Sequence, residues 1–146
     1  MPMYPELLVI PMREELTRVG VEEARTAEAV DEAVKNAKGT LMVIVNSICG
    51  CAAGKMRPAV RLALQQSPNK PSQSISVFAG QDQEATARAR ELFAGVPPSS
   101  PSIGFMRDGK LIYFMPRSAI ESRDAASLAS ELVAAFQQHC ADAVQQ

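Results

Sequence analysis

A continuous run of apolar residues, Leu-Met-Val-Ile-Val, covers residues 41–45 of the chain. Its β-branched members and its lack of polar alternation are typical of a central strand that is buried on both faces of a sheet. A second strand is expected at residues 75–79, and residues 21–25 are expected to form a short edge strand. A strand buried on both faces needs helices on both sides of its sheet, so the pattern predicts a layered α/β fold.

Apolar residues spaced three and four positions apart predict five helices. The expected helices cover residues 5–19, 27–37, 52–66, 83–93 and 124–138. The side chains expected on their inner faces are, in chain order, Leu8, Met12, Leu16 and Val19, then Ala27, Val30 and Val34, then Met56, Val60, Ala63 and Leu64, then Ala85, Ala89, Leu92 and Phe93, and finally Leu128, Leu132, Ala135 and Phe136.

A few residues are expected to set the ends and the irregularities of these helices. Thr26 and Asp82 are suitable N-caps, because their side-chain oxygens can accept hydrogen bonds from free N–H groups. Pro11 is expected to kink or divide the first helix. Pro58 lacks the N–H that the carbonyl of Gly54 would need in a regular helix. It is therefore expected to interrupt the hydrogen bonds of the third helix.

The last two strands are expected to form a hairpin. Residues 103–106 and 111–114 flank Asp108-Gly109, and Asp-Gly between two apolar runs is a strong signal for a tight turn. This last pair is therefore antiparallel, whereas the alternation of strands and helices before it predicts parallel strands. The expected architecture is a single α/β domain over residues 1–146, with a mixed sheet between two layers of helices.

Composition and charge exclude several classes of protein. The chain has 146 residues, of which 47% are hydrophobic and 21% charged, and its formal net charge is −1. These values fit an ordinary globular domain and give no electrostatic reason to expect a nucleic acid or an anionic membrane as partner. The first residues lack the basic start and apolar core of a signal peptide, and no stretch is long enough to span a bilayer, so we expect a cytoplasmic protein.

The candidate chemistry lies directly after the apolar run at residues 41–45. Cys49 and Cys51 are separated by one glycine and precede an expected helix. A helix N-terminus offers unpaired N–H groups and partial positive charge, and both stabilise a thiolate. Lys55 and Arg57 are expected to add positive charge. Three cysteines are a poor framework for a stapled secreted fold, so the pair indicates redox or metal chemistry in a reducing compartment.

A disulfide between Cys49 and Cys51 is feasible but tight. Residues i and i+2 have Cα atoms about 5.5–7 Å apart, whereas disulfides favour about 4.4–6.8 Å. Gly50 is the residue that could relax the backbone, and a strained bond would make the pair relatively oxidising. Cys49 lies nearer the loop and is expected to be the more exposed thiol and the nucleophile, with Cys51 as the resolving thiol.

On the cysteine spacing alone, redox chemistry and metal binding have comparable weight. A zinc or iron–sulfur site needs about four ligands, and the candidates are Cys49, Cys51, Cys140 and His139. The last two are distant in the sequence: His139 is expected to be a solvated residue near a helix end and Cys140 a partly packed bystander. A purely structural role, as buried free cysteines, is a third interpretation, although Gly50 and the helix start argue against it.

Several segments, in the right order, resemble one family. Residues 45–54, Val-Asn-Ser-Ile-Cys-Gly-Cys-Ala-Ala-Gly, resemble the signature of the bacilliredoxins. Residues 11–17, 77–82 and 97–102 resemble other characteristic segments of that family. The resemblance covers nearly the whole chain and lowers the weight of the metal interpretation. It implies a thioredoxin-like fold and a thiol–disulfide oxidoreductase that binds neither a metal nor a nucleotide cofactor.

The resemblance also implies a substrate. Bacilliredoxins remove bacillithiol, a low-molecular-weight thiol, from cysteines of thiolated proteins, and the first cysteine of their motif attacks, which matches Cys49. The implied partners are S-thiolated or disulfide-bonded proteins, bacillithiol or another low-molecular-weight thiol, and a cellular disulfide reductase. Isomerase activity is also attributed to the family, so a disulfide isomerase is one alternative. The alternative from another class is a metal-binding or interaction module that uses the cysteine pair.

The substrate contacts are expected beside the thiols. Thioredoxin-like folds place a cis-proline there at the start of a strand, and Pro101 stands in that position. A cis bond turns the preceding backbone groups outward, where they can pair with an extended substrate. The residues expected to contact substrate are Asn46, Ser47, Gly50, Ser100 and Pro101.

One segment departs from the family pattern. After the hairpin the family usually has Glu-Arg-His, one further residue and Ile-Glu-Gly, whereas residues 116–122 are Pro-Arg-Ser-Ala-Ile-Glu-Ser. Ser118 replaces the histidine and Ser122 the glycine, so a role of that histidine in substrate choice or proton transfer does not carry over to this chain. Arg117 and Glu121 remain and are expected to form an ion pair.

Overall fold

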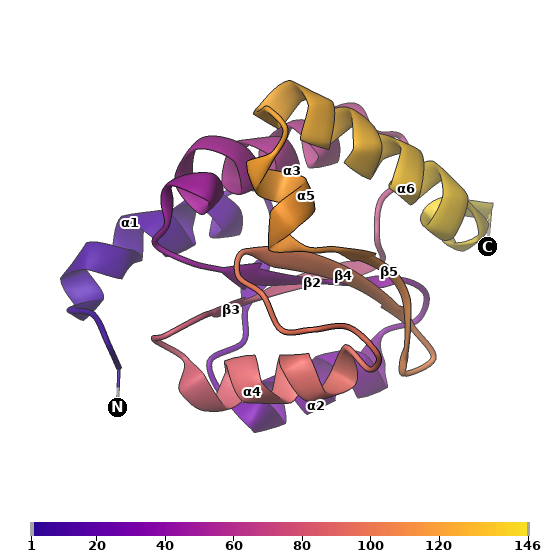
Figure 1. Ribbon diagram of the computed structural model, residues 1–146. Coiled ribbons are helices and arrows are strands. Elements are labelled where there is room, and N and C mark those ends of the chain that lie inside the picture. The colour runs from indigo at the N-terminus through magenta and orange to yellow at the C-terminus, as the bar shows by residue number, and fades with distance from the viewer. Residues whose placement is uncertain (1, 146) are drawn as a thin grey trace.

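The computed structural model describes residues 2–145, which form a mixed five-stranded sheet with helices on both faces (Figure 1). The strands are β1 (Glu22–Glu23), β2 (Leu41–Asn46), β3 (Gln73–Phe78), β4 (Ser102–Arg107) and β5 (Lys110–Met115). The helices are α1 (Glu6–Thr17), α2 (Ala27–Asn36), the π-helical segment η1 (Ala52–Met56), α3 (Arg57–Gln66), α4 (Gln83–Leu92), α5 (Arg117–Glu121) and α6 (Ala125–Gln145). No helix in the described part of the chain is long and apolar enough to cross a membrane.

The sheet has the predicted mixture of directions. Its strand order is β1-β3-β2-β4-β5, with β3 parallel to both β1 and β2. The strand pairs β2–β4 and β4–β5 are antiparallel. The hairpin turn at Asp108 and Gly109 has φ angles of 53° and 76°, the two positive values that favour Asp-Gly in a tight hairpin. The predictions of the turn and of the short edge strand are therefore confirmed.

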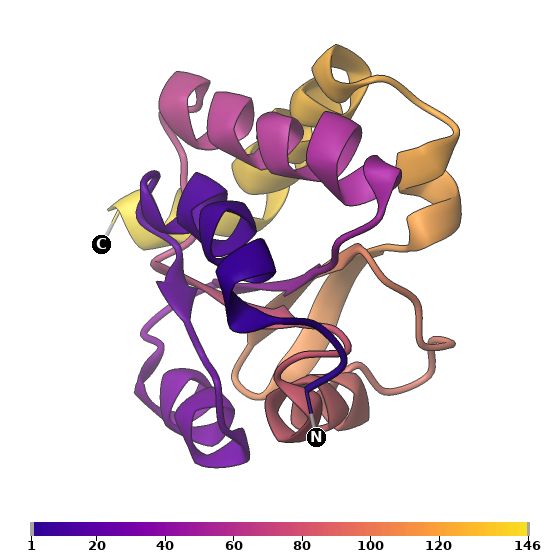
Figure 2. The same ribbon diagram turned by 90° about the vertical axis from the view of Figure 1, so that its left-hand side faces the viewer.

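The central strand β2 separates two hydrophobic cores. All six of its residues are buried. Met42 and Ile44 point into the core beneath α3 and α6, whereas Leu41, Val43 and Val45 point into the core lined by α2 and α4. Figure 1 shows α1, α3 and α6 on one face of the sheet and α2 and α4 on the other, and Figure 2 shows the same layers from the side. Burial on both faces, as the apolar run predicts, is confirmed.

The buried faces of α3 and α6 are those predicted, whereas the face predicted for α1 is confirmed only at Leu16. Leu8 is 47% exposed, and the buried side chains are Val9, Arg13 and Leu16. The helix is also not divided at Pro11. The inner face carries a buried arginine, which a search for apolar periodicity does not detect. In α2 the buried residues are Val30 and Ala33, a smaller shift from the predicted face.

The helix after the cysteines begins with a π-helical segment. The N–H of Arg57 donates to the carbonyl of Ala52, five residues back, and α3 continues from there. Pro58 follows directly and has no N–H to give to Gly54, so the regular i→i−4 ladder cannot run through this turn. The predicted interruption is confirmed, and it takes the form of a wider turn within a continuous helical segment.

Asp82 precedes α4, but the prediction that its side chain caps this helix is wrong. Its carboxylate instead accepts two hydrogen bonds of 2.8 Å from the guanidinium of Arg13, and Oδ2 accepts a third from the N–H of Phe78 at 3.1 Å. Arg13 also donates to Glu6, with Nε–Oε2 at 3.1 Å. This network joins α1 to the end of β3 and thereby connects two of the segments that resemble the family.

We expect Arg13→Met to lower the free energy of unfolding by about 3 kcal/mol, because it leaves the buried Asp82 carboxylate without its cation. Urea unfolding measures the change. The control is Arg88→Met, whose ion pair with Asp31 is partly exposed and should contribute less than about 1 kcal/mol. A loss for Arg13→Met no larger than that for Arg88→Met would contradict a stabilising role of the network.

Candidate active site at the two cysteines

The two thiols lie where β2 ends and the helical segment begins. Cys49 follows β2 after a two-residue connection, and Cys51 is the N-cap residue of η1. Both are free and half-buried. The N–H groups of Ala52 and Ala53 donate to the carbonyl of Cys49 at 3.0 and 3.1 Å, which closes the first turn immediately after the sulfur-bearing residue. A buried strand thus delivers both thiols to a helix start, as the sequence predicts.

The surroundings of Cys49 favour its thiolate. Burial raises the pKa of Cys49, but three other influences outweigh it and the net pKa is lowered. The Ser47 hydroxyl donates to Sγ at 3.2 Å, the N–H groups of Ala52 and Cys51 face the sulfur, and the charge of Arg117 acts on it. Each of these stabilises negative charge on the sulfur more than it stabilises the neutral thiol.

The cations predicted near the thiols do not act on them. Lys55 donates from Nζ to the carbonyl of Glu121 at 2.5 Å. Arg57 points inward, with a side chain only 1% exposed, and its Nη1 donates to Asn46 Oδ1 at 2.9 Å and to the Ser47 carbonyl at 2.8 Å. Neither residue is among the groups that lower the pKa of Cys49, so the predicted contribution of their charge is not found there.

Arg117 is the cation that sequence reasoning missed as a partner of Cys49. It is the first residue of α5, a five-residue helix too short to give a periodic signal. Its Nε lies 3.2 Å from Glu121 Oε2, so the predicted ion pair is confirmed, and its Nη1 donates to the Ser100 carbonyl at 3.4 Å. Ser118, which replaces the family's histidine, is exposed beside it. Arg117 is retained from the family pattern of that segment, and this was the available sign of a role near the thiols.

A cleft of about 300 Å³ opens in front of Cys49. Ser47 and Ser100, two of the predicted substrate contacts, line it. Gly50 is exposed next to Cys49, and a Cβ added there would meet nothing within 4 Å. The small residue is therefore not required by packing in this conformation, and it leaves open space beside the sulfurs.

Asn46 and Pro101 lie outside the surface of the cleft. Asn46 is 1% exposed; its Oδ1 accepts from the N–H of Ser47 at 2.9 Å and its Nδ2 donates to the Met12 carbonyl at 3.3 Å. Its side chain therefore holds Ser47 in place and is not free to contact a substrate. Pro101 is also buried, and the peptide bond between Ser100 and Pro101 is cis, as predicted.

The N-terminal segment forms a wall of the cleft that the sequence did not reveal. Met3 and Tyr4 line the cleft from the side of the Gly80 turn. The N–H of Met3 donates to the Gly80 carbonyl at 2.8 Å, while the Gln81 side chain exchanges hydrogen bonds with the backbone of Tyr4 at 3.1 and 2.9 Å. Gly80 has φ +82°, and a Cβ there would come within 3.0 Å of the Tyr4 ring.

Cys140 and His139 lie away from the thiol pair. Cys140 is 0% exposed, and burial raises its pKa, although a hydrogen bond with Thr40 opposes this. Thr40 precedes β2 and Cys49 follows it, so the third cysteine lies at the other end of the strand. His139 is half-buried, with its ring centroid 6.0 Å from that of Phe105, so it is less solvated than predicted. Within the described residues, no cluster of three or more His, Cys, Asp and Glu side chains could hold a metal.

Comparison with solved structures defines the fold. A protein with a thioredoxin fold superposes with a TM-score of 0.59 at 11% identity, over 77% of this chain and 94% of that one. A thioredoxin of Malassezia sympodialis gives a TM-score of 0.54 at 17% identity, over 82% and 90%. The chain therefore has a thioredoxin fold, with a Cys-Gly-Cys pair at the junction of its central strand and the following helix.

Comparison with known sequences gives the family. Residues 4–140 match the family model described as disulphide isomerase. A bacilliredoxin of Koribacter versatilis is 61% identical over 138 residues, 94% of each chain. Bacilliredoxins of Salinibacter ruber and Geobacillus kaustophilus are 49% and 47% identical, over 95% and 94% of this chain and 82% and 94% of theirs. The chain belongs to the bacilliredoxin family, and it is a thiol–disulfide oxidoreductase.

We expect Ser47→Ala to raise the pKa of Cys49, because it removes the hydroxyl that donates to the sulfur. A raised pKa lowers the thiolate fraction near neutral pH, so the pH profile of alkylation by iodoacetamide should move to higher pH. Ser47→Ala and the control Ser122→Ala are each made in a Cys51→Ala background, so that Cys49 is the reactive thiol. An unchanged profile for Ser47→Ala would show that the hydroxyl does not act on the thiolate.

Proposed function

We propose that this protein removes bacillithiol, or another low-molecular-weight thiol, from S-thiolated cysteines of other proteins through a mixed disulfide on Cys49. The observation that carries the proposal is the thiol itself. Cys49 has a lowered pKa, a hydroxyl donor at 3.2 Å and an open cleft in front of its sulfur. The bacilliredoxin relatives at 47–61% identity favour the same substrate class.

The first step is a thiol–disulfide exchange. The Cys49 thiolate attacks the sulfur of the small thiol in the substrate disulfide, and the bond between that sulfur and the substrate protein breaks. The electron pair leaves on the cysteine sulfur of the substrate protein, which takes up a proton as the reduced thiol. The small thiol remains on Cys49 and occupies the cleft. Arg117 and Ser47 hold the nucleophile as a thiolate before this step.

The second step uses Cys51. Its thiolate attacks Cys49 Sγ, releases the small thiol and leaves a disulfide between the two cysteines. Gly50 gives the backbone between them freedom to close this short loop. Two electrons must then come from outside, either from two molecules of a free small thiol, which leave as their disulfide, or from a cellular disulfide reductase. The partners of the cycle are therefore S-thiolated proteins, a small thiol and a reductase.

Disulfide isomerisation is the second candidate function, because the matching family model is described as disulphide isomerase. The two activities share the attack by Cys49 and differ in what remains on it. An isomerase holds the substrate protein itself on Cys49, whereas a dethiolating enzyme holds the small thiol. The mass of the trapped intermediate therefore separates them.

We expect Cys51→Ala to accumulate Cys49 carrying one small thiol after incubation with a bacillithiolated protein. Cys49→Ala should form no adduct, since Cys51 lacks the hydroxyl donor of Ser47. Mass spectrometry of the intact protein measures both results, and release of the reduced substrate is measured in the same samples. Cys140→Ala is the matched control and should react like the unaltered chain, because its thiol is buried.

Adducts of equal size on both single variants would contradict the assigned roles of the cysteines. An adduct of Cys49 with the substrate protein, without transfer of the small thiol, would replace dethiolation by isomerisation. The absence of both adducts would overturn the proposed function as a whole.

A further inference from the structure

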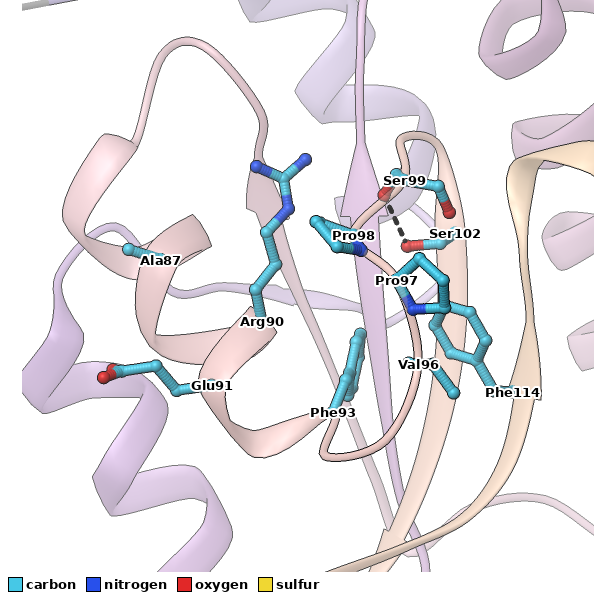
Figure 3. A pocket seen from close by; sticks show the side chains of 10 residues that line it. All are labelled: Ala87, Arg90, Glu91, Phe93, Val96, Pro97, Pro98, Ser99, Ser102 and Phe114. Carbon is cyan, nitrogen blue, oxygen red and sulfur yellow. Dashed lines mark hydrogen bonds between the residues drawn. The ribbon is translucent and has the colours of Figure 1, made fainter.

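Arg90 is the second arginine at the cleft, besides Arg117. It rises from α4, and its stem lies along an apolar hollow of about 320 Å³ formed with Phe93, Val96 and Pro98 (Figure 3). The same residue also lines the cleft of Cys49. A guanidinium on an apolar stem can bury its methylene groups and still present its charged end to a neighbouring space.

The guanidinium of Arg90 has no partner among the residues that the structure describes. Its Nε is buried without a hydrogen bond, and no carboxylate of those residues lies within ion-pair distance. Glu91, next to it on α4, points away from it in Figure 3 and pairs with Arg88 at 3.5 Å. An unpartnered guanidinium beside a reactive cleft is free to bind an anionic group of a ligand.

The lining of the cleft leaves an anion as the complementary group. It contains two arginines and no aspartate or glutamate. Arg117 is already engaged, with Glu121 through Nε and with the Ser100 carbonyl through Nη1. Arg90 has no such partners among the described residues, and a guanidinium matches the two oxygens of a carboxylate. The Tyr4 side chain lies on the same cleft and offers a further donor.

We propose that Arg90 binds a carboxylate of the small thiol and makes the cleft selective for disulfides whose small thiol is a carboxylic acid. This inference rests on the proposed function, because the small thiol occupies the cleft only when it is transferred to Cys49. The chemistry of the exchange is unchanged: the same bond breaks and the same bond forms. Arg90 contributes affinity for the carboxylate as the small thiol enters.

The test uses one carrier protein with a single cysteine, capped in turn by 3-mercaptopropionate, 2-mercaptoethanol or cysteamine. These caps share a two-carbon chain between the sulfur and a carboxylate, a hydroxyl or an ammonium group. The rate of cap transfer to Cys49 is measured by mass spectrometry in a Cys51→Ala background. Three proteins are compared: the one that retains Arg90, Arg90→Gln, and the control Arg61→Gln at an exposed position. Ratios between variants cancel the intrinsic reactivity of each cap.

Arg90→Gln should slow transfer of the mercaptopropionate cap about tenfold, the size of one charge-assisted hydrogen bond, and leave the mercaptoethanol cap nearly unchanged. Transfer of the cysteamine cap should stay equal or rise, because a like charge is removed. Arg61→Gln should alter none of them. Equal slowing of all three caps, or no change for mercaptopropionate, would overturn the role of Arg90. If the protein that retains Arg90 accepts none of the caps, the proposed function, on which this inference rests, would be overturned instead.

Discussion

The position of the reactive thiol depends on one buried guanidinium. Arg57 lies in the helix that follows the cysteines, yet its side chain reaches back to the strand end that precedes them. Its Nη1 makes two buried hydrogen bonds, to Asn46 Oδ1 and to the Ser47 carbonyl, and its Nε lies 3.2 Å from the carboxylate of Glu15, whose side chain is 44% exposed. A buried cation deprived of acceptors costs several kcal/mol, so the strand end and the helix are held together. The loop that carries Cys49 is thus closed at both ends by the same residue.

A second buried arginine, Arg13, positions the wall of the cleft that Met3 and Tyr4 form. Arg13 joins α1 to Asp82 at the end of β3, and the Gln81 side chain next to Asp82 holds the backbone of Tyr4. The two networks touch, since Asn46 donates to the carbonyl of Met12, the neighbour of Arg13. The sulfur and this wall of the cleft are therefore positioned by two neighbouring sets of buried and partly buried hydrogen bonds.

The fold was predictable because apolar periodicity and turn chemistry report on it directly: the run at 41–45, the inner face of α6 and the Asp-Gly turn are all local signals. The charged residues of the site were not predictable in the same way. Arg13 and Asp82 are 69 positions apart, and a charged side chain gives no local sign that its partner is buried. Arg57 was therefore expected at the thiols and Asp82 at a helix end. Arg117 was missed because α5 is too short to show a period.

The wall formed by Met3 and Tyr4 bears on how the protein is handled in the laboratory. These residues stand only a few positions from the amino end of the chain and border the space in front of Cys49. An affinity tag or fusion partner joined just before these two residues lies close to this space and competes with an entering substrate. A tag added after α6 leaves this space open, because the later part of α6 lies at the other end of β2, where the Thr40 hydroxyl donates to the carbonyl of His139 at 2.7 Å (Figure 1). Kinetic comparisons among variants of this protein should therefore use carboxy-terminal fusions.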